Sequence, residues 1–141
     1  KQKPLLNKGK NHYPVAISGR LCLSYQRIGT EMRVFICSPY RGDVEQNIRN
    51  AKAFSRQAAL EGYSPVVPHL LFPQFLNEDD PEERQVGIQL GLEQLAVCDE
   101  IWIFGDTISD GMKIEIQKAT ELNIRIVYKS QDDSVRRYTH E

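Results

Sequence analysis

The sequence predicts a single α/β domain in which helices cover both faces of a parallel sheet. Two short segments, 33–38 and 100–104, are rich in apolar, β-branched and aromatic residues, as expected for strands that are buried on both faces. Segments with a helical spacing of apolar residues follow both strands, and typical cap residues mark where these helices begin. Strands that alternate with helices in this way are expected to lie parallel to one another.

The domain is expected to occupy residues 32–129 of a chain of 141 residues, which is long enough to bury a sizeable core. Residues 1–31 contain six Lys or Arg and one Glu, so we expect a separate basic appendage, with a small hairpin within 14–25. Residues 130–141 are expected to form a polar tail. The whole chain has 18 Lys or Arg against 19 Asp or Glu, which gives no reason to expect a nucleic-acid polymer or an anionic membrane as a partner.

The first expected elements are the strand 33–38 and the helix that follows it. Asp43, with a glutamine three residues later, forms a capping-box pattern at the start of a helix over 44–61, and a glycine then ends that helix. The next segment, 63–67, is a short strand with a proline near its beginning. Because proline cannot donate to a sheet ladder, this strand is expected at an edge of the sheet.

The connection 68–80 is unusually rich in apolar residues, and we expect it to be a loop that packs over a pocket or a partner subunit. Asp80 then caps a helix over 81–97, which has a proline at its first position and acidic residues in its first turn. Gly87 and Gly91 lie one turn apart on this helix. They predict a groove in which another surface can come close.

The strand 100–104 leads through a polar turn into a helix that ends near Leu122, with Asp110 as its expected N-cap. A last strand is expected over 124–128. Strands and helices in this order and spacing predict a parallel sheet wrapped by helices, of flavodoxin-like or Rossmann-like size.

Cysteine and histidine positions give no sign of a disulfide or a metal site. Cys22, Cys37 and Cys98 are odd in number and widely spaced, so reduced thiols are expected. The three histidines have no ligand spacing with these cysteines, and no glycine-rich dinucleotide or P-loop motif occurs, so neither a metal nor a cofactor is expected. No apolar run is long enough to span a bilayer and no signal peptide is visible, so a cytoplasmic location is expected.

Two loops, 38–43 and 105–111, leave the carboxyl ends of predicted strands, where ligands bind in open α/β sheets. Each loop precedes a helix N-terminus, where free backbone N–H groups and the helix dipole favour anions. Ser38, Arg41 and Ser109 add side-chain donors, so a phosphate or a sugar hydroxyl is the expected ligand. The alternative is that these side chains only satisfy the loop backbone or lie in solvent.

Glu115 is the sharper candidate for chemistry. It lies between the apolar positions Met112 and Ala119, on the core-facing side of the predicted helix. A carboxylate in such a place is costly unless it is paired or used. We therefore consider Glu115 a candidate catalytic residue, against the alternative that it reaches water or pairs with an Arg or Lys.

Three segments of the domain resemble the nucleoside 2-deoxyribosyltransferase superfamily, which includes the 2-deoxynucleoside 5-phosphate N-hydrolases. Segment 34–42 is similar to the first strand and its sugar- or phosphate-binding loop, and segment 98–104 is similar to an aspartate followed by a buried strand. Ser109, Gly111 and Glu115 match the serine, the glycine and the nucleophilic glutamate at the start of the next helix. The resemblance covers the whole predicted domain.

The resemblance implies that Glu115 attacks the anomeric carbon of a deoxyribosyl group and expels the nucleobase through an oxocarbenium-like state. Water, in a hydrolase, or another base, in a transferase, then resolves the glycosyl-enzyme. The implied substrate is a small-molecule nucleoside or nucleotide, and the implied assembly is a homo-oligomer. The loops and the resemblance together make the following residues candidates for substrate binding: Ser38, Tyr40, Arg41, Gly42, His69, Ser109, Asp110 and Gly111.

The sequence departs from the pattern of this superfamily at two positions. Gly91 stands where many members have an aspartate that assists departure of the base, and Lys113 replaces a glycine. An alternative function is therefore a non-catalytic sensor or sequestering protein that binds a nucleotide with the same fold. A second alternative is an assembly domain, in which the apolar connection and the glycine groove only form an oligomer.

Overall fold

The structure is a computed structural model that describes residues 32–129. The expected basic appendage with its hairpin, Cys22 and the expected polar tail lie outside the described residues. Among residues 32–129, no helix is both long enough and apolar enough to cross a membrane. Within the same residues, Cys37 and Cys98 are buried free thiols, and no cluster of three or more His, Cys, Asp or Glu is placed to hold a metal ion.

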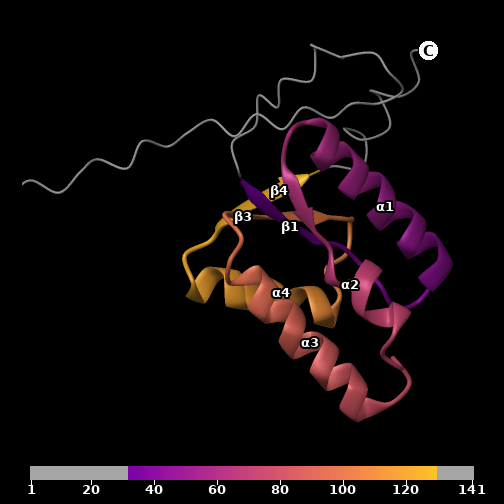
Figure 1. Cartoon of the computed structure of the whole chain (residues 1–141). Coiled ribbons are helices and arrows are strands. Elements are labelled where there is room, and N and C mark those ends of the chain that lie inside the picture. Colours follow the sequence, from indigo (N-terminus) through magenta and orange to yellow (C-terminus); the bar gives the residue numbers. More distant parts are fainter. Residues whose placement is uncertain (1–31, 130–141) are drawn as a thin grey trace, which may run out of the picture.

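The centre of the fold is a four-stranded parallel sheet in the order β2-β1-β3-β4 (Figure 1). The predicted fold class, a parallel sheet wrapped by helices in one domain, is confirmed. The strand with the proline lies at one edge of the sheet, as expected, and its partner is the central strand β1. The strands are β1 (Arg33–Cys37), β2 (Ser64–Val66), β3 (Glu100–Phe104) and β4 (Arg125–Lys129).

Helices lie on both faces of this sheet, with α1 on one face and α3 and α4 on the other (Figure 1). Successive residues of a strand point to opposite faces, so β1 contributes to two separate apolar clusters. Ile36 packs on the α1 face against Phe54, whereas Cys37 packs on the other face with Leu95 and Met112. The helices are α1 (Val44–Leu60), α2 (Pro68–Leu71), the 3₁₀ helix η1 (Phe72–Gln74), α3 (Pro81–Leu95) and α4 (Asp110–Glu121).

The connection 68–80 is not the simple loop that its composition predicts, because it begins with α2 and η1. Pro68 stands in the first turn of α2, where its fixed φ angle suits a helix and its missing N–H has no partner to lose. Its side chain is buried, and α2 contacts both α1 and α3. The apolar residues of this connection therefore attach a short helix to the carboxyl edge of the sheet.

The predicted N-cap of the last helix is wrong by one residue. Ser109, not Asp110, caps α4, because its extended backbone lets Oγ accept a hydrogen bond from the backbone N–H of Met112 at 3.3 Å. Asp110 is the first helical residue, and its exposed carboxylate pairs with Lys113 at 3.2 Å. The negative charge of Asp110 thus lies in the first turn, where the helix dipole favours it.

Candidate functional site

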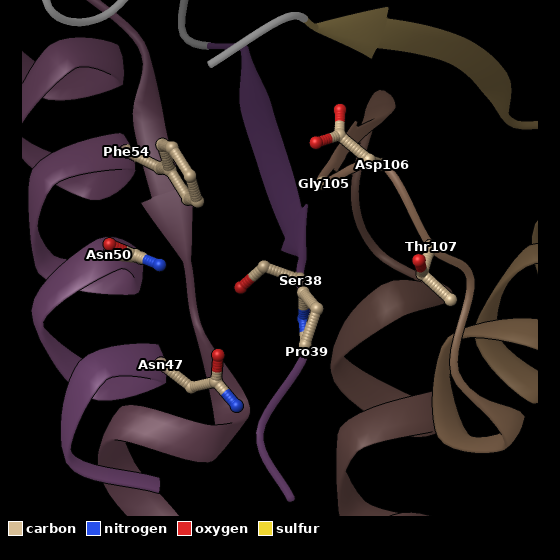
Figure 2. A pocket seen from close by; sticks show the side chains of 8 residues that line it. All are labelled: Ser38, Pro39, Asn47, Asn50, Phe54, Gly105, Asp106 and Thr107. Carbon is tan, nitrogen blue, oxygen red and sulfur yellow. The ribbon is translucent and has the colours of Figure 1, made fainter. Parts of the chain in front are cut away.

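A pocket of about 220 Å³ opens between the loops that follow β1 and β3. The chain leaves β1 through α1 toward β2 on one side, and it returns through α3 to β3 on the other side. The pocket therefore lies at the point where the strand order reverses, which is where open α/β sheets bind ligands. Its lining residues are Ser38, Pro39, Asn47, Asn50, Phe54, Gly105, Asp106 and Thr107 (Figure 2).

Both loops are held in place by local contacts. The side-chain amide of Asn47, on the first turns of α1, donates to the backbone carbonyls of Tyr40 at 3.0 Å and Arg41 at 3.1 Å. Gly105 has a φ angle of 105°, which a residue with a side chain adopts only under strain, so the sharp turn after β3 needs a glycine. A Cβ atom at this position would lie 3.5 Å from the ring of Pro39, so the two loops are also in contact.

The side chains of Ser38 and His69 form a hydrogen bond at the edge of the pocket. The Ser38 hydroxyl oxygen lies 3.2 Å from Nε2 of His69, which is carried by α2. Burial lowers the pKa of His69 to about 4, so the imidazole is neutral near pH 7. The ring of Tyr40 lies 5.9 Å from the imidazole, measured between ring centroids, and is tilted by 48°.

Glu115 lies on α4 and meets Cys37 at the carboxyl end of β1. Burial raises the pKa of Glu115 to about 7, and a hydrogen bond from the Cys37 thiol lowers it by a smaller amount. Burial, and then the nearby charge of Glu115, raise the pKa of Cys37 far above its usual range, so the thiol is protonated and able to donate. None of the ion pairs within residues 32–129 involves Glu115.

The structure brings some of the predicted site residues together and separates others. Ser38 lines the pocket and His69 is bonded to it, but Glu115 is not among the lining residues. The reason is that successive side chains at the end of β1 point to opposite faces. Cys37 packs with Met112 of α4, whereas the side chain of Ser38 points toward α1 (Figure 2). Arg41 is not a lining residue, and its guanidinium donates to the backbone carbonyl of Glu78 at 3.1 Å.

The other predicted binding residues lie near the starts of the two helices. Gly42 has a φ angle of 99° and precedes the N-cap of α1. Ser109, Asp110 and Gly111 are exposed at the start of α4 and do not line the pocket. A Cβ atom at Gly111 would have no neighbour within 4 Å, so the space beside this helix start is open.

Sequence reasoning missed the lining residues Asn47, Asn50 and Phe54 on α1. It did place Asp106 and Thr107 in a candidate loop, but not among the binding residues. The two asparagines lie one turn apart on α1, soon after the cap residue Asp43, and this spacing was a usable signal. Within the described part of the chain, the lining thus offers two amides, two hydroxyls and one carboxylate, but no Lys or Arg. Such a set suits a small molecule rich in hydroxyl or amide groups better than a bare phosphate.

Comparisons with known proteins bear on this fold and site. A family model described as "Domain of unknown function (DUF7768)" matches residues 32–129. Among solved structures, a 2-deoxyribosyltransferase from the psychrotolerant bacterium Bacillus psychrosaccharolyticus is similar, with a TM-score of 0.54, 18% sequence identity, and coverage of 70% of this chain and 72% of that one. No curated protein matches the sequence. The structural likeness establishes a shared fold.

Proposed function

The chain belongs to the DUF7768 family, and we propose that it cleaves or transfers the N-glycosidic bond of nucleosides or nucleotides, with Glu115 as the nucleophile. The observation that carries the proposal is the state of this carboxyl group, which is half-buried, has a pKa of about 7 and lies beside Cys37 at the carboxyl end of β1. Carboxyl groups with strongly shifted pKa values are common at active sites. The shared fold with a 2-deoxyribosyltransferase and the resemblance around Ser109 and Gly111 support the same chemistry.

In the proposed reaction, a carboxylate oxygen of Glu115 forms a bond to the anomeric carbon of the sugar while the bond from that carbon to the base nitrogen breaks. The electron pair of the broken bond leaves with the base, which takes up a proton from solvent water; the water or the second base that attacks next gives up one proton in turn. Water or a second base then attacks the same carbon and releases the carboxylate. Only ionised Glu115 can attack, so the rate should rise with pH through about 7.

The positions of the pocket and of Glu115 restrict how a substrate can bind. Ser38 and Asn50 line the pocket on the α1 side of β1, whereas Glu115 lies on the α4 side. A substrate that uses both must therefore lie across the carboxyl end of β1, with its anomeric carbon toward α4. The start of α4 at Ser109 offers free backbone N–H groups to a 5-phosphate, if the substrate carries one.

A panel of 2-deoxynucleosides and their 5-monophosphates tests the proposal, with free base followed by chromatography. Glu115→Gln and Glu115→Ala should abolish base release, because neither side chain can form the glycosyl-enzyme. Glu121→Gln, which changes an exposed carboxylate on the same helix, should retain the wild-type rate. Base release that survives in both Glu115 variants would contradict the proposal.

A second candidate function is nucleotide binding without catalysis. It is favoured by the separation of Glu115 from the pocket, and by Gly91, which packs against Pro68 where the resemblance implies an acid. In that case a nucleotide should raise the thermal midpoint of the protein without any release of base.

We also propose that the protein forms a homo-oligomer. The side chains of Leu71 and Phe75 are apolar and exposed, and a partner subunit could cover them. These two residues lie on the apolar connection that was expected to meet a pocket or a partner subunit. Sedimentation velocity over a range of protein concentrations measures the assembly. If neither catalysis nor nucleotide binding is found, assembly is the remaining role.

A further inference from the structure

We propose that His69 is a positioning residue, which holds the Ser38 hydroxyl in one orientation so that it binds a polar group of a 2-deoxynucleoside in the pocket. The inference rests on the proposed function in its choice of ligand, but it concerns binding and does not require catalysis. It also changes the part expected of His69, which acts through Ser38 and is not itself a lining residue.

The first support is the geometry of the pair. Ser38 and His69 are 31 residues apart in sequence, yet Oγ and Nε2 lie 3.2 Å apart. The side chain of Ser38 points toward α1 and the pocket (Figure 2), and only 5% of the residue is exposed. A hydroxyl has one proton to donate and can accept two hydrogen bonds. The bond to His69 uses one of these and leaves the rest for a ligand.

The second support is the way in which α2 is held against its neighbours. A Cβ atom at Gly91 would lie 3.4 Å from Cβ of Pro68, so α3 and α2 approach closely at this point. A methyl group at Gly91 would therefore be in van der Waals contact with the ring of Pro68. Pro68 is the residue before His69, so this contact holds the start of the helix that carries the imidazole against α3. Gly91 thus has a structural role at the position where the resemblance implies an acid.

The third support is the charge state of the imidazole. Burial alone lowers the pKa of His69, which is therefore neutral near pH 7 and presents one ring nitrogen to Ser38 in a single role. A base this weak is poorly suited to remove a proton from Ser38, so activation of the serine as a nucleophile is not the better explanation. A fixed hydroxyl loses less rotational freedom when a ligand binds, and this preorganisation favours affinity.

The test compares His69→Gln with His69→Met, two side chains of similar length of which only glutamine can form a hydrogen bond. Its amide can donate or accept, so it can replace either tautomer of the imidazole. We expect the dissociation constants of the four common 2-deoxynucleosides, measured by calorimetry, to stay within about threefold of wild type in the Gln variant. In the Met variant they should rise about tenfold, the usual effect of one lost hydrogen bond.

Two further measurements complete the design. Ser38→Ala should weaken binding by about tenfold, and adding it to His69→Met should weaken binding little further, because both changes remove the same interaction. In the folded protein, Ser38→Ala should also shift the ¹⁵N signal of the His69 Nε2 atom at pH 7. This second readout does not depend on any change at position 69, so it holds even if the Met variant does not fold.

The outcomes separate this inference from the proposed function. Three outcomes would overturn the inference and leave the proposed catalysis untouched. They are equal affinities of the Gln and Met variants, additive effects of Ser38→Ala and His69→Met, and an unmoved ¹⁵N signal. Binding of 2-deoxynucleosides without base release would overturn only the proposed catalysis. Wild-type protein that binds none of the four 2-deoxynucleosides would overturn the inference as well.

Discussion

Replacing Glu115 with glutamine should stabilise the protein at pH 8 and change its stability much less at pH 5. Burial raises the pKa of Glu115 from 4.5 to about 7, so the folded protein favours the protonated acid. The contribution of this group to stability is therefore complete below pH 4.5 and is lost as the pH rises through 7. Glutamine is neutral at every pH and avoids this loss.

The size of the effect follows from the two pKa values of Glu115. A difference of about 2.5 in pKa corresponds to about 3 kcal/mol between the fully protonated and fully ionised limits. From pH 5 to pH 8 most of this difference is lost, so the advantage of Glu115→Gln should grow by about 2.5 kcal/mol over that range. Any constant cost of fitting the amide beside Cys37 cancels, because it is the same at both pH values.

Urea unfolding at pH 5 and pH 8 measures this change, with the fluorescence of Trp102 as the signal. Trp102 is the only tryptophan of the chain and is 2% exposed, so its emission reports on the core. Glu121→Gln is the matched control and should show no such dependence on pH. An advantage of Glu115→Gln that is equal at the two pH values would refute the reasoning, because it would mean that the carboxylate is not desolvated.

Three further predictions concern stability. Ser109→Ala should lower the free energy of unfolding by about 1 kcal/mol, because the N–H of Met112 loses its cap, whereas Ser109→Asp should retain most of the stability in urea titrations. Gly91→Ala should raise the free energy of unfolding by up to about 1 kcal/mol, because a methyl group fits beside Pro68, whereas Gly91→Leu should lower the thermal midpoint. His69 has a depressed pKa in the fold, so wild type should lose stability as the pH falls from 6.5 to about 4, and His69→Gln should remove that part of the loss in a pH series of thermal midpoints.

Each of these three predictions has an outcome that contradicts it. Equal stability of wild type and Ser109→Ala would mean that the cap contributes nothing. A lower midpoint for Gly91→Ala would mean that α2 and α3 cannot accept even a methyl group. If His69→Gln loses as much stability as wild type when the pH falls below 6.5, other groups cause the loss.

Much of the fold could be predicted because its signals are local. The strand 100–104 was predicted with the bounds that the structure has, since every residue in it is buried and residues 101–104 form a continuous apolar run. The starts of α1 and α3 were found from Asp43 and Asp80, whose side chains accept hydrogen bonds from the first turns of the helices. The start of α4 was misjudged because Ser109 and Asp110 are adjacent and both are common caps.

The site was harder to predict because its contacts join distant residues. The bond between Ser38 and His69 depends on how α2 packs, and nothing in the sequence around either residue reveals it. Asn50 lines the pocket because its face of α1 is turned toward the end of β1. The position of α1 depends in turn on the order of the strands in the sheet. The roles of Glu115 and of the other candidate binding residues stay predictions.

The strand order has a consequence for how the chain comes together during synthesis. The central strand β1 is made first among the described strands, yet it pairs with β3, and the contact between Arg33 and Asp99 that opens this pairing spans 66 residues. At roughly 5–20 residues per second, a ribosome needs several seconds to supply that partner. During this interval the apolar strand has one open side, so nascent chains would be most prone to aggregate, and most dependent on chaperones, before β3 emerges.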